Sequence, residues 1–362
     1  MPLSRIVPAE YSAQLVDKAA QFKRAFVPFA LPEPAVFASS PLSYRLRAEF
    51  RMFHRGERVD YAMFAAADPK RPVPIDDFPA ADETIRAAMP RLRALLQADE
   101  RLRRDLFQTD FLATLSGELL ITLIYHRRLD EQWEAAARAL AGELKVQLIG
   151  RSRGQKIVLG RDWVLEAFEL DGRHLRYKQI EASFSQPNGG VNQQMLGWAR
   201  RQAAGLGGDL LELYCGNGNF TVALAPLFNR VLATEVSKTS VHAAQYNLDA
   251  NQIGNVALVR MSSDEISGAL AGAREYRRME GVDLDQYRFS TLFVDPPRSG
   301  LDAPTLALAA GFEHILYISC NQQSLLENVA ALHATHAITA AAAFDQFPYT
   351  EHLECGLLLT RR

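Results

Sequence analysis

Two clusters of polar residues follow short apolar segments in the second half of the chain and could take part in chemistry. Asp-Pro-Pro-Arg-Ser-Gly occupies residues 295–300, and Ser-Cys-Asn occupies residues 319–321. Because proline cannot continue the hydrogen bonding of a sheet, the two prolines predict the end of a buried strand. Ligands bind at the carboxyl ends of parallel strands, which favours Cys320 as a nucleophile that meets a ligand. The alternative is a small buried apolar residue, the commoner state of a lone cysteine.

Candidate proton acceptors lie in a polar, aromatic loop near the carboxyl end of the chain. Residues 344–354 read Phe-Asp-Gln-Phe-Pro-Tyr-Thr-Glu-His-Leu-Glu and lie between two apolar segments. The ionisable residues of this loop are Asp345, Glu351, His352 and Glu354. One of them could act as a general base. Composition alone does not choose among the acids, and a merely solvated loop remains the alternative.

A glycine-containing loop predicts a strand, a tight turn and the start of a helix over residues 209–220, Asp-Leu-Leu-Glu-Leu-Tyr-Cys-Gly-Asn-Gly-Asn-Phe. Gly216 and Gly218 allow the backbone to turn sharply and to approach a ligand closely. Glu235 ends the next predicted strand, 19 residues after Gly216. A carboxylate at that place can accept hydrogen bonds from the ribose hydroxyls of an adenosine.

Such a loop suits either NAD or S-adenosylmethionine. Thr221 occupies the position at which the dinucleotide fingerprint has its third glycine, and the loop carries the polar Asn217 and Asn219. These departures favour S-adenosylmethionine. The alternative is an ordinary strand-to-helix turn that binds no cofactor.

The three cysteines, Cys215, Cys320 and Cys355, have no Cys-x-x-Cys spacing, which excludes a zinc or iron–sulfur site built on cysteines alone. Cys215 and Cys355 are interpreted as packing residues. His126 has no partner at ligand spacing, so no metal is expected. So few cysteines fit a reducing cytoplasm, where we expect the protein to act.

The composition is that of a globular protein rather than a disordered or membrane-spanning one. The 362 residues are 48% hydrophobic and 23% charged, and no run approaches the roughly 18 apolar residues of a membrane span. The net charge of −2 does not indicate a nucleic-acid partner. Residues 1–186 carry 28 Lys and Arg against 25 Asp and Glu, so the first half is the better candidate for contact with an anion.

The two halves of the chain differ in their predicted secondary structure. In the second half, strands alternate with helical segments, which predicts a parallel, doubly wound α/β sheet. The expected strands are 210–214, 230–234, 256–260, 291–294 and 315–319, with closing strands at 341–344 and 355–360 and a bridging helix at 192–204. The first half predicts an α+β domain with a mainly antiparallel sheet. Its expected helices are 11–26 and 82–104, and its expected strands are 45–53, 107–115, 119–126, 146–149 and 155–159.

Three motifs together resemble the RNA uracil-5-methyltransferase family. They are Asp-Pro-Pro-Arg-Ser-Gly at 295–300, Ile-Leu-Tyr-Ile-Ser-Cys-Asn at 315–321 and the loop at 344–354. Residues 43–51 and 184–188 extend the similarity to the bacterial tRNA-modifying members. The resemblance implies a C-terminal class I (Rossmann-like) S-adenosylmethionine-dependent methyltransferase domain over residues 181–362. An N-terminal α+β RNA-binding domain is expected over residues 1–180.

The resemblance also assigns roles to individual residues. Uracil C5 is a poor nucleophile, and addition of a thiolate to C6 activates it. Family correspondence makes Cys320 that thiolate and Glu354 the base that removes the C5 proton. The residues expected at the cofactor are Gln186, Tyr214, Gly216, Asn219, Glu235 and Asp295.

The implied substrate is uridine 54 in the T loop of tRNA, with tRNA-like RNAs as further possibilities and no obligatory protein partner. Arg45, Arg47 and Arg51 alternate along a predicted strand and form either an RNA-contact face or a solvated one. The remaining candidate RNA contacts are Phe107, the His-Arg-Arg cluster at 126–128 and Arg298, which with Asp295 could also touch the target base.

Other functions compete with this interpretation. The rRNA-modifying relatives carry a four-cysteine iron–sulfur cluster that this chain lacks, and cytosine-5 enzymes place their cysteine after Pro or Thr, whereas Ser319 precedes Cys320 here. An RNA-binding or tRNA-folding factor with secondary methylation is the alternative from another class.

Overall fold

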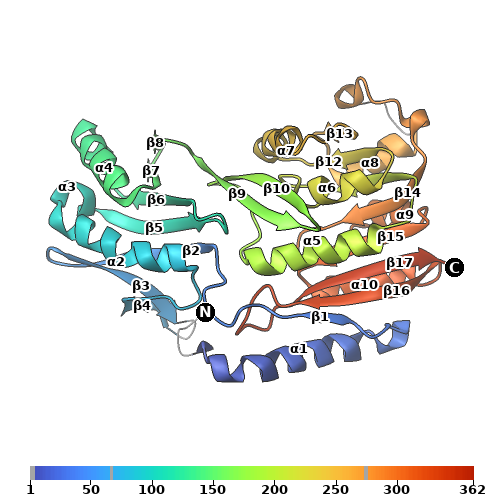
Figure 1. Cartoon of the computed structure of the whole chain (residues 1–362), viewed down its shortest axis with the longest axis horizontal. Coiled ribbons are helices and arrows are strands. Elements are labelled where there is room, and N and C mark those ends of the chain that lie inside the picture. Colours follow the sequence, from blue (N-terminus) through green and yellow to red (C-terminus); the bar gives the residue numbers. More distant parts are fainter. Residues whose placement is uncertain (1–4, 66–67, 273–275) are drawn as a thin grey trace. The chain divides into compact units, whose positions relative to one another are not determined.

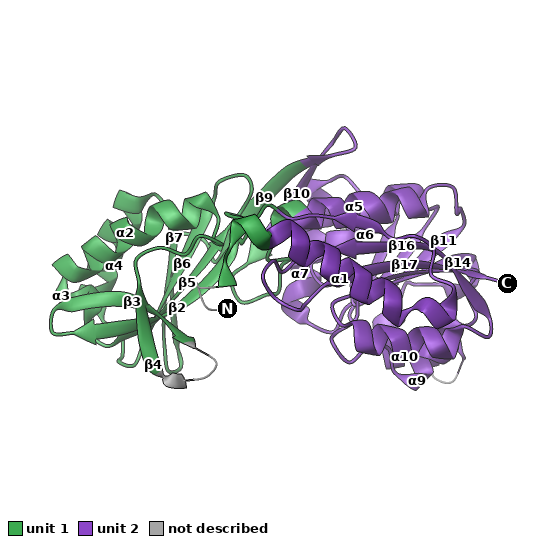
Figure 2. Ribbon diagram, turned by 90° about the horizontal axis from the view of Figure 1, so that it is seen from below, with its two compact units in different colours: residues 1–10, 40–168, 179–190 green, residues 11–39, 169–178, 191–362 purple. Residues whose placement is uncertain are grey.

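The computed structural model describes residues 5–65, 68–272 and 276–362. The chain forms two compact units, shown in different colours in Figure 2. Unit 1 contains residues 1–10, 40–168 and 179–190, and unit 2 contains residues 11–39, 169–178 and 191–362. No helix in the described part of the chain is long and apolar enough to cross a membrane.

Unit 2 is built on an eight-stranded sheet with the order β1-β16-β17-β15-β14-β11-β12-β13. Strand β17 is antiparallel to both of its neighbours, and the other pairs are parallel. The strands are β1 (Ala35–Phe37), β11 (Asp209–Leu213), β12 (Val231–Thr234), β13 (Val256–Val259), β14 (Phe289–Val294), β15 (His314–Ser319), β16 (His336–Phe344) and β17 (Glu354–Arg361). The predicted doubly wound α/β organisation is confirmed, and the two closing strands extend it.

Helices cover both faces of this sheet (Figure 1), so its central strands are buried on both sides. One face packs its apolar side chains against α1 (Tyr11–Ala25), α8 (Ser263–Leu270), α9 (Ala303–Ala309) and α10 (Gln322–Leu332). On the other face lies α5 (Gly189–Ala203), whose Trp198 packs against Phe344 and occupies the space above Gly356. The remaining helices of the unit are α6 (Asn219–Leu224) and α7 (Lys238–Ala250).

Unit 1 contains a seven-stranded sheet with the order β4-β3-β2-β5-β6-β7-β8. All pairs of adjacent strands in this sheet are antiparallel except β6 and β7, which are parallel and are connected by the crossover helix α4. The strands are β2 (Arg47–Arg55), β3 (Arg58–Ala65), β4 (Asp68–Ile75), β5 (Leu106–Ala113), β6 (Leu119–Tyr125), β7 (Gln147–Ser152) and β8 (Gln155–Leu159). The helices are α2 (Glu83–Ala98), α3 (Glu100–Arg103) and α4 (Glu131–Leu144). The predicted α+β class is thus confirmed, although β3, β4 and α4 were not foreseen.

The boundary predicted at residue 180 does not match the compact units. Helix α1 belongs to unit 2 because Phe22 and Phe26 lie in the core of that unit, and β1 pairs with β16. The hairpin of β9 (Trp163–Leu170) and β10 (Arg173–Ile180) contributes its tip, residues 169–178, to unit 2 and its remainder to unit 1. Contacts distant in sequence decide these assignments, so a single cut point cannot describe them.

Candidate active site

Cys320 and Glu354 lie at the same end of two neighbouring strands in unit 2. Strand β15 ends at Ser319, which pairs with Cys355 of the antiparallel β17. Cys320 continues beyond β15, and Glu354 is the first residue of β17, so the two side chains lie close together. Asp295 directly follows β14, the other neighbour of β15. The Cys320 thiol is half-buried, and Glu354 is only 4% exposed.

The surroundings of Cys320 keep its thiol protonated at neutral pH. Burial, and after it the carboxylates of Glu354 and Asp295, raise the pKa of the Cys320 thiol to about 11, while Arg298 opposes them. Since only the thiolate is a good nucleophile, addition to a substrate requires transfer of the thiol proton to a nearby base.

The two carboxyl groups beside the thiol hold their protons more strongly than ordinary acids. Burial raises the pKa of Asp295 to about 7. Burial also raises the pKa of Glu354 well above its usual range, and Asp295 adds to this effect while Arg298 opposes it. A carboxylate with a raised pKa is a stronger base once it is ionised, which suits proton transfer near neutral pH.

Arg298 supplies the positive charge of this site. Its backbone carbonyl accepts a hydrogen bond from Asn321 Nδ2 at 2.8 Å, and its guanidinium lies 3.5 Å from His352 Nε2. Asn321 also caps α10 by accepting from the backbone N–H of Gln323. The residue after the candidate nucleophile therefore fixes both a helix start and the loop that carries Arg298.

The acids of the loop at 344–354, which the sequence does not distinguish, differ in their burial and in their partners in the structure. Asp345 is buried and forms an ion pair with Lys18, 2.7 Å from Nζ to Oδ1. Glu351 and His352 are exposed. Glu354 is the acid of this loop that shares an electrostatic environment with Cys320, which supports its assignment as the base.

The glycine loop joins β11 to α6 in the way expected of a ligand-binding turn. Gly216 and Gly218 have φ values of 57° and 79°, and a Cβ atom on Gly216 would meet nothing within 4 Å. The Glu235 carboxylate accepts hydrogen bonds from the backbone N–H of Gly216 at 3.1 Å and of Ser237 at 2.7 Å. Open space beside a glycine and a fixed, partly exposed carboxylate suit the nucleoside portion of a cofactor.

Two other predicted cofactor residues have defined partners in unit 2. The Tyr214 hydroxyl donates to Ser263 Oγ at 2.8 Å, and its φ of 60° is unusual for a residue other than glycine. Asn219 and Asn192 exchange side-chain hydrogen bonds of 2.8 and 3.0 Å. Asn192 was not foreseen, since an asparagine on a predicted helix gives no signal of such a pair. Gln186 lies in unit 1, so its cofactor role remains a prediction.

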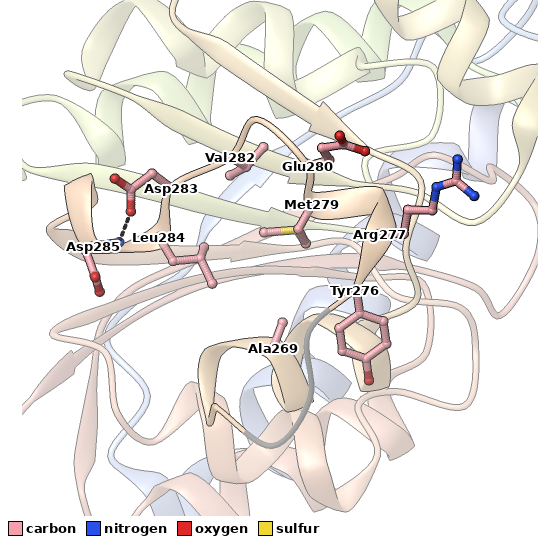
Figure 3. A pocket seen from close by; sticks show the side chains of 9 residues that line it. All are labelled: Ala269, Tyr276, Arg277, Met279, Glu280, Val282, Asp283, Leu284 and Asp285. Carbon is pink, nitrogen blue, oxygen red and sulfur yellow. Dashed lines mark hydrogen bonds between the residues drawn. The ribbon is translucent and has the colours of Figure 1, made fainter.

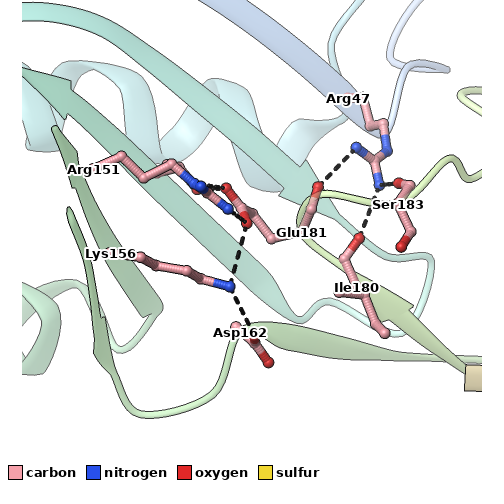
Figure 4. Close-up of polar contacts among 8 residues, drawn as sticks. Arg47, Arg151, Lys156, Asp162, Ile180, Glu181 and Ser183 are labelled. Carbon is pink, nitrogen blue, oxygen red and sulfur yellow. Dashed lines mark hydrogen bonds and ion pairs between the residues drawn. The ribbon is translucent and has the colours of Figure 1, made fainter. Parts of the chain in front are cut away.

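The predicted arginine face of unit 1 is wrong for Arg47. Its guanidinium donates to Ser185 Oγ at 2.7 Å and to the carbonyl of Ser183 at 2.5 Å, with longer contacts to Ile180 and Glu181 (Figure 4). Burial lowers the pKa of Arg47. The side chain therefore holds the 180–185 segment rather than facing phosphate. Arg45 is half-buried and donates to the Arg47 carbonyl. Of the three arginines, Arg51 is the exposed one.

Arg51, Phe107 and His126 form a stack on unit 1. The Arg51 guanidinium lies 3.8 Å from the centre of the Phe107 ring, and the Phe107 and His126 rings are 4.0 Å apart and inclined by 28°. Phe107 and His126 also line a hollow of about 820 Å³. The arginines that line it are Arg127, Arg128, Arg151 and Arg153. The structure thus brings together three residues that the sequence had named separately.

Another hollow of about 610 Å³ lies beside residues 276–285 of unit 2 (Figure 3). Its lining mixes Met279, Val282 and Leu284 with charged residues, and Asp283 caps its own turn by accepting from the Asp285 N–H. It contains none of the candidate catalytic residues. Within the described ranges, no group of three His, Cys, Asp or Glu side chains is arranged to hold a metal ion.

The fold and the site geometry define a Rossmann-like methyltransferase with a cysteine nucleophile candidate. Residues 10–362 match the family described as tRNA (Uracil-5-)-methyltransferase. The chain is 76% identical over its full length to the tRNA/tmRNA (uracil-C(5))-methyltransferase of Aromatoleum aromaticum, of which it covers 98%. It is 54% identical to the enzyme of the same name from Pseudomonas entomophila, with 98% of each covered. The chain therefore belongs to the tRNA (uracil-5-)-methyltransferase family.

A solved structure supports the same fold. The Pyrococcus abyssi tRNA (uracil-54, C5)-methyltransferase in complex with S-adenosyl-L-homocysteine matches this structure with a TM-score of 0.73 and 20% identity. The match covers 97% of this chain and 83% of that one. The likeness establishes the shared architecture.

Proposed function

We propose that this enzyme methylates C5 of uridine 54 in the T loop of tRNA, and of the corresponding uridine in transfer-messenger RNA, through a covalent bond between Cys320 and C6. The observation that carries this proposal is the position of Cys320 and Glu354 at adjacent strand ends, beside Asp295 and Arg298. The names of the relatives, tRNA/tmRNA (uracil-C(5))-methyltransferase, support the two substrates. We propose the cytoplasm as the place of the reaction, because the proposed substrate is tRNA.

The first step is addition of the Cys320 sulfur to C6, with the thiol proton passing to a neighbouring carboxylate. The electron pair of the C5–C6 double bond moves toward the O4 carbonyl, so the ring becomes an enolate whose C5 is nucleophilic. Arg298, the cationic group of the site, stabilises this negative charge. Methylation leaves C5 with both a methyl group and its original hydrogen. Glu354 then removes that hydrogen as a proton, and the electron pair expels the Cys320 thiolate.

S-adenosylmethionine supplies the methyl group when it is bound, and the residues of unit 2 fit it. Glu235 would accept hydrogen bonds from the ribose hydroxyls, because two backbone N–H groups already orient its carboxylate. The open side of Gly216 leaves room for the ligand beside the backbone. Tyr214, Asn219 and Asp295 are assigned to the same site, and the family resemblance adds Gln186 as a further candidate.

We expect Glu235→Ala to weaken S-adenosylmethionine binding at least tenfold and to leave tRNA affinity unchanged. A hydrogen bond to a charged group is worth about 1.5–3 kcal/mol, and tenfold corresponds to about 1.4 kcal/mol. Calorimetric titration with S-adenosylmethionine measures the change. Glu313→Ala, which removes an exposed acid elsewhere in the same unit, is the matched control. Identical titration curves for Glu235→Ala and the parent chain would remove Glu235 from the cofactor site.

The Arg51–Phe107–His126 stack and the basic hollow beside it are the proposed RNA surface of unit 1. Loop nucleotides are commonly recognised by stacking on aromatic rings and arginine planes, and the surrounding arginines attract phosphates. Arg151 contributes less than its neighbours because its guanidinium is paired with Glu181 at 2.6 Å (Figure 4).

We expect Arg51→Ala and Phe107→Ala to weaken tRNA binding for different physical reasons. Phe107 lies between Arg51 and His126, so its loss breaks up the platform on which a base can stack. Base stacking is worth about 1–3 kcal/mol, and its loss should have little effect on salt dependence. Loss of Arg51 removes a phosphate contact and should lower the slope of log affinity against log salt by roughly 0.7–0.9. Filter binding across a salt series measures both. Arg138→Ala, an exposed arginine of α4 paired with Glu134, serves as the control, and an unchanged slope for Arg51→Ala would leave Arg51 as a solvated side chain.

The direct test of the proposed function is nucleoside analysis of unmodified tRNA after incubation with labelled S-adenosylmethionine. We expect label in 5-methyluridine and at position 54 alone. Label in methylated cytosine, at another tRNA position, or in ribosomal RNA incubated in parallel would contradict the proposal.

A further inference from the structure

We propose that Lys18 is a positioning residue for Glu354, because it ties the loop between β16 and β17 into one conformation. This inference rests on the proposed function, in which Glu354 removes the C5 proton. The loop spans residues 345–353, and its two ends meet where Phe344 of β16 pairs with Glu354 of β17. Whatever fixes this loop also fixes the start of the strand that carries the base.

Lys18 uses its ammonium group to hold both ends of the loop. Nζ lies 2.7 Å from Asp345 Oδ1 and donates to the carbonyl oxygens of Phe347 and His352, each at 3.0 Å. An ammonium group has three donors, so these contacts account for all of them. Asp345 is the first residue of the loop, and His352 lies two positions before Glu354.

The position of Lys18 in its own helix is unusual. The buried residues of α1 are Tyr11, Leu15, Lys18 and Phe22, so the lysine occupies the stripe that packs against the rest of unit 2. Lys18 is 7% exposed and Asp345 is 1% exposed. Tyr11 belongs to the same cluster, since its hydroxyl accepts from the Ser39 N–H at 2.7 Å and interacts with Asp345.

Stability alone does not explain a buried ion pair at this place. Well-packed apolar residues of similar volume often stabilise a protein as well as such a pair does, or better. The charged group adds conformational specificity. Its three hydrogen bonds to defined partners hold the loop in one arrangement. The His352 end of the loop also faces Arg298. A loop without Lys18 would therefore leave Glu354 less well placed against the substrate.

The consequence concerns one step of the reaction. Cys320 lies between β15 and α10 rather than on this loop, so addition and methyl transfer should depend little on Lys18. Removal of the C5 proton depends on the place of Glu354, and a misplacement of about 1 Å can slow a catalytic step roughly 100-fold. Loss of Lys18 should therefore slow product release from Cys320 by about 10- to 100-fold.

The test compares Lys18→Met with the double variant Lys18→Met/Asp345→Asn, which no longer buries an unpaired carboxylate and so guards against loss of folding. Lys23→Met is the matched control, since Lys23 lies on the same helix in an exposed ion pair with Glu33. Unmodified tRNA and labelled S-adenosylmethionine are used in a single turnover. Methyl transfer is read as total labelled RNA, and release as the fraction that leaves the protein on a denaturing gel. Glu354→Gln is run alongside.

We expect both Lys18 variants to transfer the methyl group at nearly the parental rate and to retain methylated RNA on the protein, whereas Lys23→Met behaves as the parent does. Release at the parental rate by the folded double variant would overturn the proposal. So would an equal loss of transfer and release, which indicates a merely structural role. If Glu354→Gln retains methylated RNA and the Lys18 variants do not, this inference alone fails. If Glu354→Gln retains none, the assignment of the base fails, and the inference fails with it.

Discussion

A Cys320→Ala chain should form no covalent complex with tRNA in which the target uridine carries fluorine at C5, while the parent chain should form one that survives denaturing electrophoresis. Fluorine cannot leave C5 as a cation, so once the methyl group has been transferred the ring stays bonded to sulfur. Without the thiol there is no bond to trap, and methylated product should fall below detection. Cys215→Ala and Cys355→Ala retain Cys320 and should still give the complex. A complex in Cys320→Ala would show that another residue is the nucleophile.

The rate at which this complex forms should rise with pH. Burial and the nearby carboxylates raise the pKa of the Cys320 thiol to about 11, so between pH 6 and 9 the thiolate is a minor species. Its fraction grows about tenfold for each pH unit below the pKa, and the thiolate is the form that adds to C6. Asp295, with a pKa raised to about 7, becomes an available proton acceptor in the same range. A rate independent of pH over this range would mean that a different step limits formation of the complex.

The parallel half of the fold could be predicted because each of its strands is a short apolar run followed by turn residues. The motif at 319–321 shows how far such local evidence extends. A strand end, a thiol and the Asn321 helix cap are neighbours in the sequence, so their arrangement follows from local rules. Glycine at 216 and 218 is likewise required by positive φ angles that the turn itself imposes.

Features that depend on distant contacts could not be predicted in this way. An alternating arginine pattern gives no indication that Arg47 is bound by the carbonyl groups of residues 180–183, more than 130 positions away. The choice between Asp345 and Glu354 as the base also depends on a distant contact, because Asp345 is ion-paired with Lys18, 327 positions away. Lys18 itself left a weak local signal, a charge within the apolar stripe of an amphipathic helix.

Glu354→Gln should leave the methylated RNA attached to Cys320, even when the target is an ordinary uridine. The glutamine has nearly the shape of the glutamate but cannot accept the C5 proton, so addition and methyl transfer proceed while elimination stalls. General base catalysis is worth roughly 100- to 10,000-fold in rate, and the slow step should lengthen accordingly. On a denaturing gel, labelled RNA should migrate with the protein and be released over a correspondingly longer time. Glu351→Gln changes an exposed acid of the same loop and should release product normally. If Glu354→Gln releases free RNA that contains 5-methyluridine at the parental rate, another residue is the base. Asp295 would then be the next candidate, since its carboxylate also acts on the pKa of the Cys320 thiol.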